Sequence, residues 1–167
     1  RRRRDPAECD AGVRGGVAGG VSVLTLRAAK PVDAAFIYRV AETTMRPYVE
    51  SAGKKWAAQG MRDKCEQDAA DARTRIVVIA GADVGFFKVD SRPDDIVIDA
   101  LLLLPEHQRS GIGSQLLNGV LRESALRQVP TRLFVYHANP ARSFWQKHGF
   151  VAVGEANDHV QMEKHPQ

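Results

Sequence analysis

The sequence predicts an α/β fold in which a single mixed sheet is flanked by helices. The chain has 167 residues, of which 44% are hydrophobic, so it can bury one sizeable core. Strand-like and helix-like patterns follow one another in the order β-α-α-β-β-β-α-β-α-β-β, which is typical of a mixed sheet domain. Because no internal repeat or second domain is visible, we expect one folded domain over residues 21–167.

The first elements are one strand and two helices. Residues 22–29, "SVLTLRAA", have the alternation of a strand. Apolar residues at helical spacing then predict a helix that starts near Asp33 and ends at Pro47. A second helical stretch, rich in charged residues, is expected from about Ser51 to Arg73.

Three strands follow these helices. The segments "TRIVVIAG" (74–81) and "DVGFFKVD" (83–90) predict a hairpin with its turn around residues 81–83. The segment "DDIVIDALLLL" (94–104) predicts a longer strand, which Pro105 ends.

The last part alternates helices with strands. A helical period resumes near Gly111 and continues to residue 128, and "TRLFVYHA" (131–138) is a strand. A short helix follows, with Asn139 as its N-cap and Gly149 as its C-cap. The final two strands are "FVAVGE" and "HVQMEK".

Composition excludes several classes of function. Residues 1–20 hold five of the 24 basic side chains and three of the 20 acidic ones, which leaves only +2 of the total charge of +4 for the rest. A nearly neutral body lacks the basic stripe of a nucleic-acid-binding domain. No apolar run approaches the ~20 residues of a membrane-spanning helix, so we expect no membrane partner. Cys9 and Cys65 form neither a disulfide framework nor a metal-ligand spacing, which favours a cytoplasmic protein without a bound metal.

The first 20 residues have three interpretations. The run "RRRR" could contact nucleic acid or acidic lipid. The segment could instead be a disordered extension, because it is Gly-rich and poor in apolar residues. It could also be a non-native start. We favour the last two and exclude the segment from the fold argument.

A glycine pair marks the start of the long helix. Gly111 and Gly113 stand where a strand and a turn lead into that helix. A helix N-terminus has unsatisfied N–H groups and a partial positive charge, so this arrangement suits a phosphate group. The P-loop pattern is absent, and Leu116 stands where a dinucleotide-binding fingerprint needs its third glycine. An ordinary glycine-containing turn is the alternative.

Two motifs resemble those of the GNAT acetyltransferases. The pattern Gln-x-x-Gly-x-Gly at Gln108, Gly111 and Gly113 is similar to the family's pyrophosphate-binding turn. About 26 residues later, "NPARSFWQKHGF" resembles its second signature, which this chain matches at Asn139, Phe144, Lys147, Gly149 and Phe150. The resemblance covers roughly residues 21–164. It implies the GNAT fold, with one mostly antiparallel sheet, and acetyl-CoA as cosubstrate.

The resemblance also implies which residues bind acetyl-CoA. The strand before the turn would pair with the pantetheine arm through its backbone, and the turn would surround the pyrophosphate. Asn139 would reach the pantetheine while also capping its helix. The implied cofactor-binding residues are Leu101, Leu102, Leu103, Gln108, Arg109, Ser110, Gly111, Ile112, Gly113, Ser114, Asn139 and Trp145.

Acetyl transfer to an amine needs a base and an acid. Strand alternation puts Asp99 on the face of Leu101 and Leu103, and we predict it to be the catalytic base, acting through water. A solvated strand carboxylate is the alternative, and the other base candidates are His107, His137 and Tyr136. The acid position of the family, a Tyr in the second signature, is Trp145 here. An indole cannot deliver a proton as a phenol does, so solvent, Tyr48 or Tyr136 would have to act, or catalysis is weak.

The acceptor would bind against the first helix and the segment after it. The candidate substrate-binding residues are Glu42, Arg46, Tyr48 and Glu50, beside Trp56. A solvated, charged helix surface is the alternative. The sequence thus predicts an N-acetyltransferase acting on a primary amine of a small molecule or peptide, with a catalytically weak acyl-CoA-binding module as the alternative. Many relatives form homodimers, and the sequence leaves a homodimer open.

Overall fold

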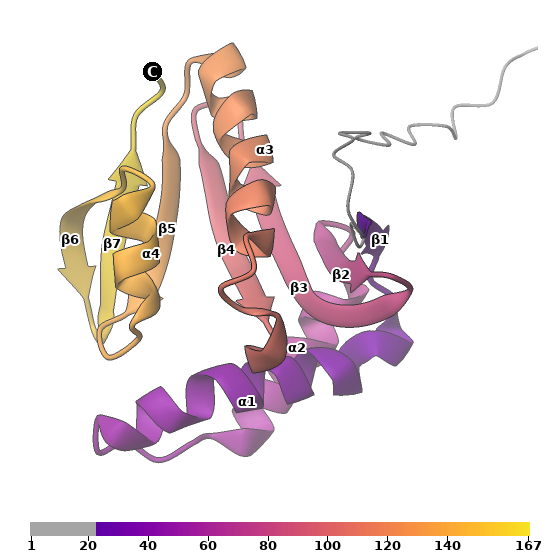
Figure 1. Ribbon diagram of the computed structural model, residues 1–167. Helices are drawn as coiled ribbons and strands as arrows, with labels where there is room; N and C mark the ends of the chain where they lie inside the picture. Colours follow the sequence, from indigo (N-terminus) through magenta and orange to yellow (C-terminus); the bar gives the residue numbers. More distant parts are fainter. Residues whose placement is uncertain (1–22) are drawn as a thin grey trace, which may run out of the picture.

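The computed structural model describes residues 23–167, and in them one seven-stranded sheet carries helices on both faces (Figure 1). The predicted α/β fold class is confirmed. The prediction for residues 1–20 lies outside the described residues. The strands are β1 (Leu24–Ala28), β2 (Thr74–Ile79), β3 (Ala82–Ser91), β4 (Ile96–Leu103), β5 (Thr131–Tyr136), β6 (Val151–Ala156) and β7 (His159–Lys164). The α-helices are α1 (Ala34–Ser51), α2 (Ala58–Ala70), α3 (Ile112–Arg127) and α4 (Ala141–Lys147). None of the helices in this range is both long and apolar enough to span a membrane.

The strand order is β1-β2-β3-β4-β5-β7-β6, and every neighbouring pair is antiparallel except β4 and β5. These two parallel strands pair only where residues 96–98 of β4 face residues 131–133 of β5. Beyond Ile98 the strands separate, and Figure 1 shows them diverging toward their lower ends. The C-terminal half of β4 therefore has no strand partner on its β5 side.

Two apolar clusters hold the helices against the sheet. On one face, Leu117 of α3 and Trp145 of α4 pack with residues such as Ile98 of β4. On the other face, Ile37 of α1 packs with Phe86 of β3 and its neighbours. In Figure 1, α3 and α4 lie in front of the sheet, while α1 crosses its lower end.

The predicted hairpin joins β2 to β3, and its turn is shorter than expected. Ala80 and Gly81 alone connect the strands, with φ angles of 49° and 81°. Two positive φ angles are the geometry of a type I′ turn, which matches the twist of paired strands. Asp83, which we expected in the turn, already belongs to β3.

Two helix boundaries were predicted wrongly. α1 continues to Ser51 with Pro47 inside it. Proline removes one backbone hydrogen bond, to the carbonyl four residues earlier, and that carbonyl belongs to exposed Thr43, where water can satisfy it. Val49, beyond the proline, still packs against the core, which favours continuing the helix. α2 begins at Ala58 rather than near Ser51, and Trp56 is buried in the preceding loop.

Candidate functional site

A β-bulge lies where β4 leaves β5. Lys88 of β3 pairs with Ala100 and Val89 pairs with Ile98, so Asp99 has no opposite residue. Ile98 and Leu101, three residues apart, pack in the same cluster beneath α3. Since simple alternation cannot place both there, the bulge turns Asp99 and Ala100 toward the opposite face. Asp99 does not share the face of Leu101 as predicted, and its side chain is exposed to solvent.

A cavity of about 700 Å³ opens beside this part of β4, where α1, α3 and α4 converge. It brings together all the predicted cofactor-binding residues except Ser110 and Ile112. Ile112 packs against the core instead, and the hydroxyl of Ser110 donates to the carbonyl of His107 (2.7 Å). The cavity is lined by Thr44, Met45, Tyr48, Leu101, Leu102, Leu103, Gln108, Arg109, Gly111, Gly113, Ser114, Asn139, Pro140, Ala141, Ser143, Phe144, Trp145 and Lys147.

The N-terminus of α3 faces the cavity without a side-chain cap. Gly111 occupies the N-cap position with φ of 84°, a left-handed conformation that favours glycine. The first helical bond runs from the N–H of Gln115 to the carbonyl of Gly111 (3.0 Å). The N–H groups of residues 112–114 precede that bond and have no acceptor inside the helix. They form an arrangement that suits an anion.

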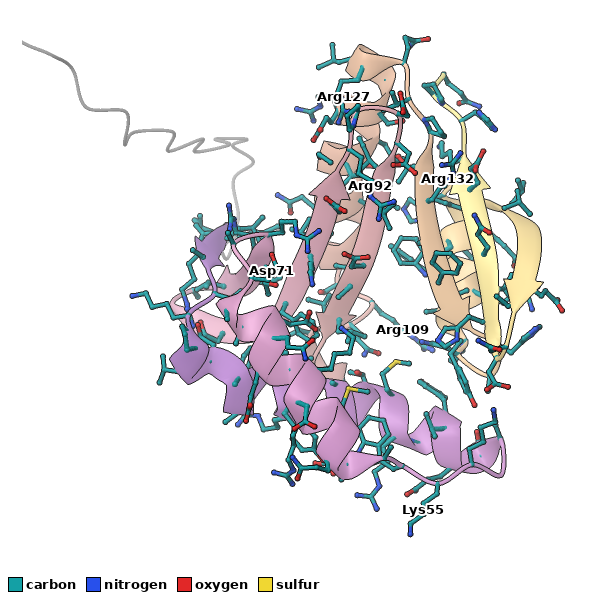
Figure 2. The ribbon with its side chains drawn as sticks, turned by 180° about the vertical axis from the view of Figure 1, so that it is seen from behind. Lys55, Asp71, Arg92, Arg109, Arg127 and Arg132 are labelled. Atoms are coloured by element: carbon teal, nitrogen blue, oxygen red, sulfur yellow. The ribbon has the colours of Figure 1, made fainter. Side chains whose placement is uncertain are left out.

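The turn before α3 is held by its own side chains. The side-chain amide of Gln108 donates through Nε2 to the carbonyl of Leu103 at 2.9 Å, which ties the turn to the end of β4. Arg109 has φ of 57°, and its side chain is exposed. Figure 2 shows Arg109 between the lower ends of β4 and β5. Gln108 thus supports the turn with the donor that we expected at the pyrophosphate, while Arg109 lies on the cavity wall with its charge free to meet an anion.

The entry to α4 forms another wall. Asn139 Oδ1 accepts from the N–H of Ala141 (2.9 Å), and Asn139 Nδ2 contacts Met45 Sδ of α1 (3.6 Å). Pro140 occupies the N-cap position that we predicted for Asn139. Asn139 therefore caps the helix from the residue before the N-cap. Gly149 follows α4 with φ of 88°, as its expected role at the helix end requires.

Trp145 is 7% exposed and lines the cavity beside the entry to α4. Phe144 and Phe150 pack edge-to-face against it, with ring centroids 5.0 and 5.6 Å away. In the part of the chain that the structure describes, no group accepts a hydrogen bond from its indole N–H. Because Trp145 lines the cavity, that N–H is available to a ligand bound there.

Only one predicted acceptor-binding residue lies on the cavity wall. Tyr48 of α1 lines the cavity, whereas Arg46 bonds to Glu50 (2.8 Å) and Glu42 (3.1 Å) along the outside of the helix. These ion pairs raise the pKa of Arg46, with the Glu50 hydrogen bond as the larger cause. The three charged residues thus form a solvated row of ion pairs, which was the alternative interpretation of this segment.

Two residues of the α1 wall, Thr44 and Met45, were not predicted from the sequence. They precede Tyr48 by four and three residues, so helical spacing from Tyr48 could have found them. Five further wall residues at α4 were not predicted as site residues: Pro140, Ala141, Ser143, Phe144 and Lys147. Phe144 and Lys147 had been matched only to the second signature.

Asp99 and the other base candidates all lie off the cavity wall. His107 is half-buried in the turn, and exposed His137 is 3.4 Å from Glu155. Tyr136 is buried and packs edge-to-face against His159, with centroids 5.5 Å apart. Among the described residues, no histidine lines the cavity.

Comparisons with known proteins agree with the fold. Residues 72–152 match a family model described as an acetyltransferase (GNAT) domain. A PaiA N-acetyltransferase from Thermoplasma acidophilum in complex with coenzyme A is 20% identical, with a TM-score of 0.69 over 85% of this chain and 98% of that one. An acetyltransferase from Thermus thermophilus is 22% identical (TM-score 0.66; 85% and 96% covered). Ard1 from Thermoplasma volcanium is 21% identical (TM-score 0.63; 86% and 98% covered). The search of curated proteins found no match.

Proposed function

We propose that this chain, whose residues 72–152 match a GNAT acetyltransferase domain, is an acetyl-CoA-dependent N-acetyltransferase acting on a primary amine of a small molecule or a peptide. One observation carries the proposal. A single cavity joins the unpaired edge of β4 to the uncapped N-terminus of α3. A long ligand with an anionic group and an amide-containing arm fits both features at once.

The residues present suit coenzyme A. The N–H groups at the start of α3 would hold the pyrophosphate, and Gly111 and Gly113 keep side chains away from it. Arg109 and Lys147 add positive charge on the same wall. The free backbone groups of residues 101–103 would pair with the pantetheine arm as an added strand would. Bound there, acetyl-CoA supplies the activated acetyl group.

The chain's own residues would then move protons. An amine attacks only in its neutral form, so a base must remove a proton from the ammonium. We keep Asp99 in this role. It stands at the first position after the last β4–β5 pair, and its exposed carboxylate is accessible to an acceptor or a bridging water. A backbone N–H near Leu103 would polarise the thioester carbonyl.

A catalytically weak acyl-CoA-binding module is the second candidate, and Trp145 favours it. This residue replaces a phenol by an indole, which donates a hydrogen bond but no proton. Such a protein would bind coenzyme A and acetylate amines slowly or not at all.

Two measurements separate the candidates. Calorimetry gives the affinity for coenzyme A, and a thiol-reactive dye follows release of coenzyme A from acetyl-CoA across a panel of amines, amino acids and peptides. An N-acetyltransferase binds and releases thiol with at least one amine. Binding without turnover on the whole panel supports the module, and absence of binding contradicts both.

A further inference from the structure

Acetyl transfer to an amine must end with a proton on the departing sulfur, and the cavity wall shows where that proton can come from. We infer that Tyr48 of α1 is the acid that protonates the coenzyme A thiolate. This inference rests on the proposed function and names a catalytic residue for it. From the sequence, solvent, Tyr48 and Tyr136 all remained open as the proton source, and so did weak catalysis without one.

Tyr48 is the one phenol on the cavity wall formed by the described residues. Tyr136 lies elsewhere, buried with its ring against His159. Phenols and thiols have ordinary pKa values of about 10 and about 8.5, so a proton passes between them without a large energetic difference. A phenol can therefore serve a leaving thiolate.

The other hydroxyl groups on the wall are engaged or unsuited. The hydroxyl of Thr44 donates to the carbonyl of Val40 (2.7 Å), and that of Ser143 donates to the carbonyl of Pro140 (2.9 Å). Ser114 belongs to the first turn of α3, where the anion would bind. The Tyr48 hydroxyl makes no hydrogen bond to any residue from 23 to 167, and its side chain is only half-buried. It is a donor without a protein acceptor.

The position of Tyr48 follows from a contact between α1 and the entry to α4. Met45 touches Asn139 across the cavity edge (Sδ to Nδ2, 3.6 Å), and Tyr48 follows Met45 by one helical turn. Residues three apart on a helix share a face, so Tyr48 also points toward the α4 side. Trp145, the residue at the family's acid position, lies on that side and lines the same cavity. The indole N–H can hold the sulfur by a hydrogen bond while the phenol delivers the proton.

The step balances as follows. The lone pair of the neutral amine forms the N–C bond to the acetyl carbon, and the C–S bond breaks with its electron pair on sulfur. The phenolic proton of Tyr48 moves to that sulfur, which gives free coenzyme A thiol. The nitrogen loses one proton to the base, and the Tyr48 phenolate regains one from solvent.

Four variants test the assignment: Tyr48→Phe, Trp145→Tyr, the double variant, and Tyr136→Phe. Tyr38→Phe is a matched control on the same helix. The Tyr38 hydroxyl lies between Trp56 Nε1 (3.3 Å) and Glu42 Oε1 (3.2 Å), away from the cavity. For each protein we would measure kcat and KM, the affinity for coenzyme A, and the ultraviolet titration of the bound coenzyme A thiol.

We expect Tyr48→Phe to lower kcat about 10²-fold while the affinity for coenzyme A changes less than about threefold. The titration midpoint of the bound thiol should rise by about one pH unit, because the thiolate loses a hydrogen-bond donor. Adding Trp145→Tyr should restore most of the lost kcat. Tyr38→Phe and Tyr136→Phe should match the parent protein in both readouts.

Equal thiol midpoints in the parent protein and Tyr48→Phe would overturn the inference, whatever the turnover. A loss of kcat with Tyr136→Phe and not with Tyr48→Phe would overturn it as well. Failure of the proposed function looks different: the parent protein would bind coenzyme A yet acetylate no amine. In that case the thiol titration still decides whether Tyr48 contacts the sulfur.

Discussion

Replacing Gly113 with alanine should strengthen the fold and weaken coenzyme A binding at the same time. Gly113 is the second residue of α3 and lies on the cavity wall. A Cβ atom there would meet Phe144 Cζ at 3.4 Å, at the edge of ordinary van der Waals contact, and no backbone atom nearby. The alanine methyl group therefore changes the surface that faces the ligand, and it fits against Phe144 without a clash.

The two effects can be estimated separately. Alanine in a helix is more favourable than glycine by up to about 1 kcal/mol, which corresponds to a Tm increase of roughly 2–4 °C for a domain of this size. The new methyl group would hold an anion away from the helix N–H groups. Loss of one hydrogen bond to a charged group costs about 1.5–3 kcal/mol, or about 10- to 100-fold in Kd. Thermal unfolding monitored by circular dichroism gives the first quantity, and calorimetric titration with coenzyme A gives the second.

Gly119 is the matched control in the same helix. No atom lies within 4 Å of a Cβ atom at Gly119, and the residue is exposed and outside the cavity. Gly119→Ala should raise the Tm by a similar amount and leave the Kd unchanged. If the two variants bind coenzyme A equally well, the start of α3 does not hold the pyrophosphate and the reasoning is refuted.

Three further predictions follow from individual side chains. Asp99→Asn should lower kcat at neutral pH roughly 10²-fold with little change in the Kd for coenzyme A; unchanged steady-state turnover would leave Asp99 a structural residue. Gly85→Ala should destabilise the protein by about 1–3 kcal/mol in urea unfolding, because its Cβ would lie 2.2 Å from the carbonyl oxygen of Leu102 on β4, and parental stability would contradict that packing. Arg27 bonds to Asp33 through two nitrogens (2.8 and 2.9 Å), and its hydrogen bonds hold the pKa of Asp33 below the ordinary value. That stabilisation is present above about pH 4 and is lost as the pH falls further. Asp33→Asn should therefore lower the unfolding free energy at pH 7 and lower it less at pH 3. If the destabilisation by Asp33→Asn grew toward low pH, the assigned direction of the Asp33 pKa shift would be refuted.

The order of helices and strands could be predicted because its determinants are local. Alternation predicts the strands, helical spacing predicts α1 and α3, and Pro105 and Gly149 follow the ends of β4 and α4. Pro47 shows the limit of local rules. Proline disfavours a helix interior in any sequence, yet here the packing of Val49 against the core favours a continuous α1.

The candidate site was likewise predicted where its determinants are local and missed where they depend on packing. The glycine turn and the Asn139 helix were recognised because each motif lies within a short segment of chain. The opposite wall was recognised only at Tyr48, since the rotation of α1 about its axis decides which side chains face the cavity. Arg46, two residues from Tyr48, pairs with glutamates on the outside of the helix instead.

By itself the sequence determined the fold class, the turn at the head of α3 and the side chains that suit an anion, because periodicity and glycine geometry act over a few residues. Only the tertiary structure decided that a bulge turns Asp99 away from the face of Leu101, and that Met45 meets Asn139 from 94 residues away. Strand register and helix rotation are fixed by packing between distant segments, and neither can be deduced from the order of residues within one segment.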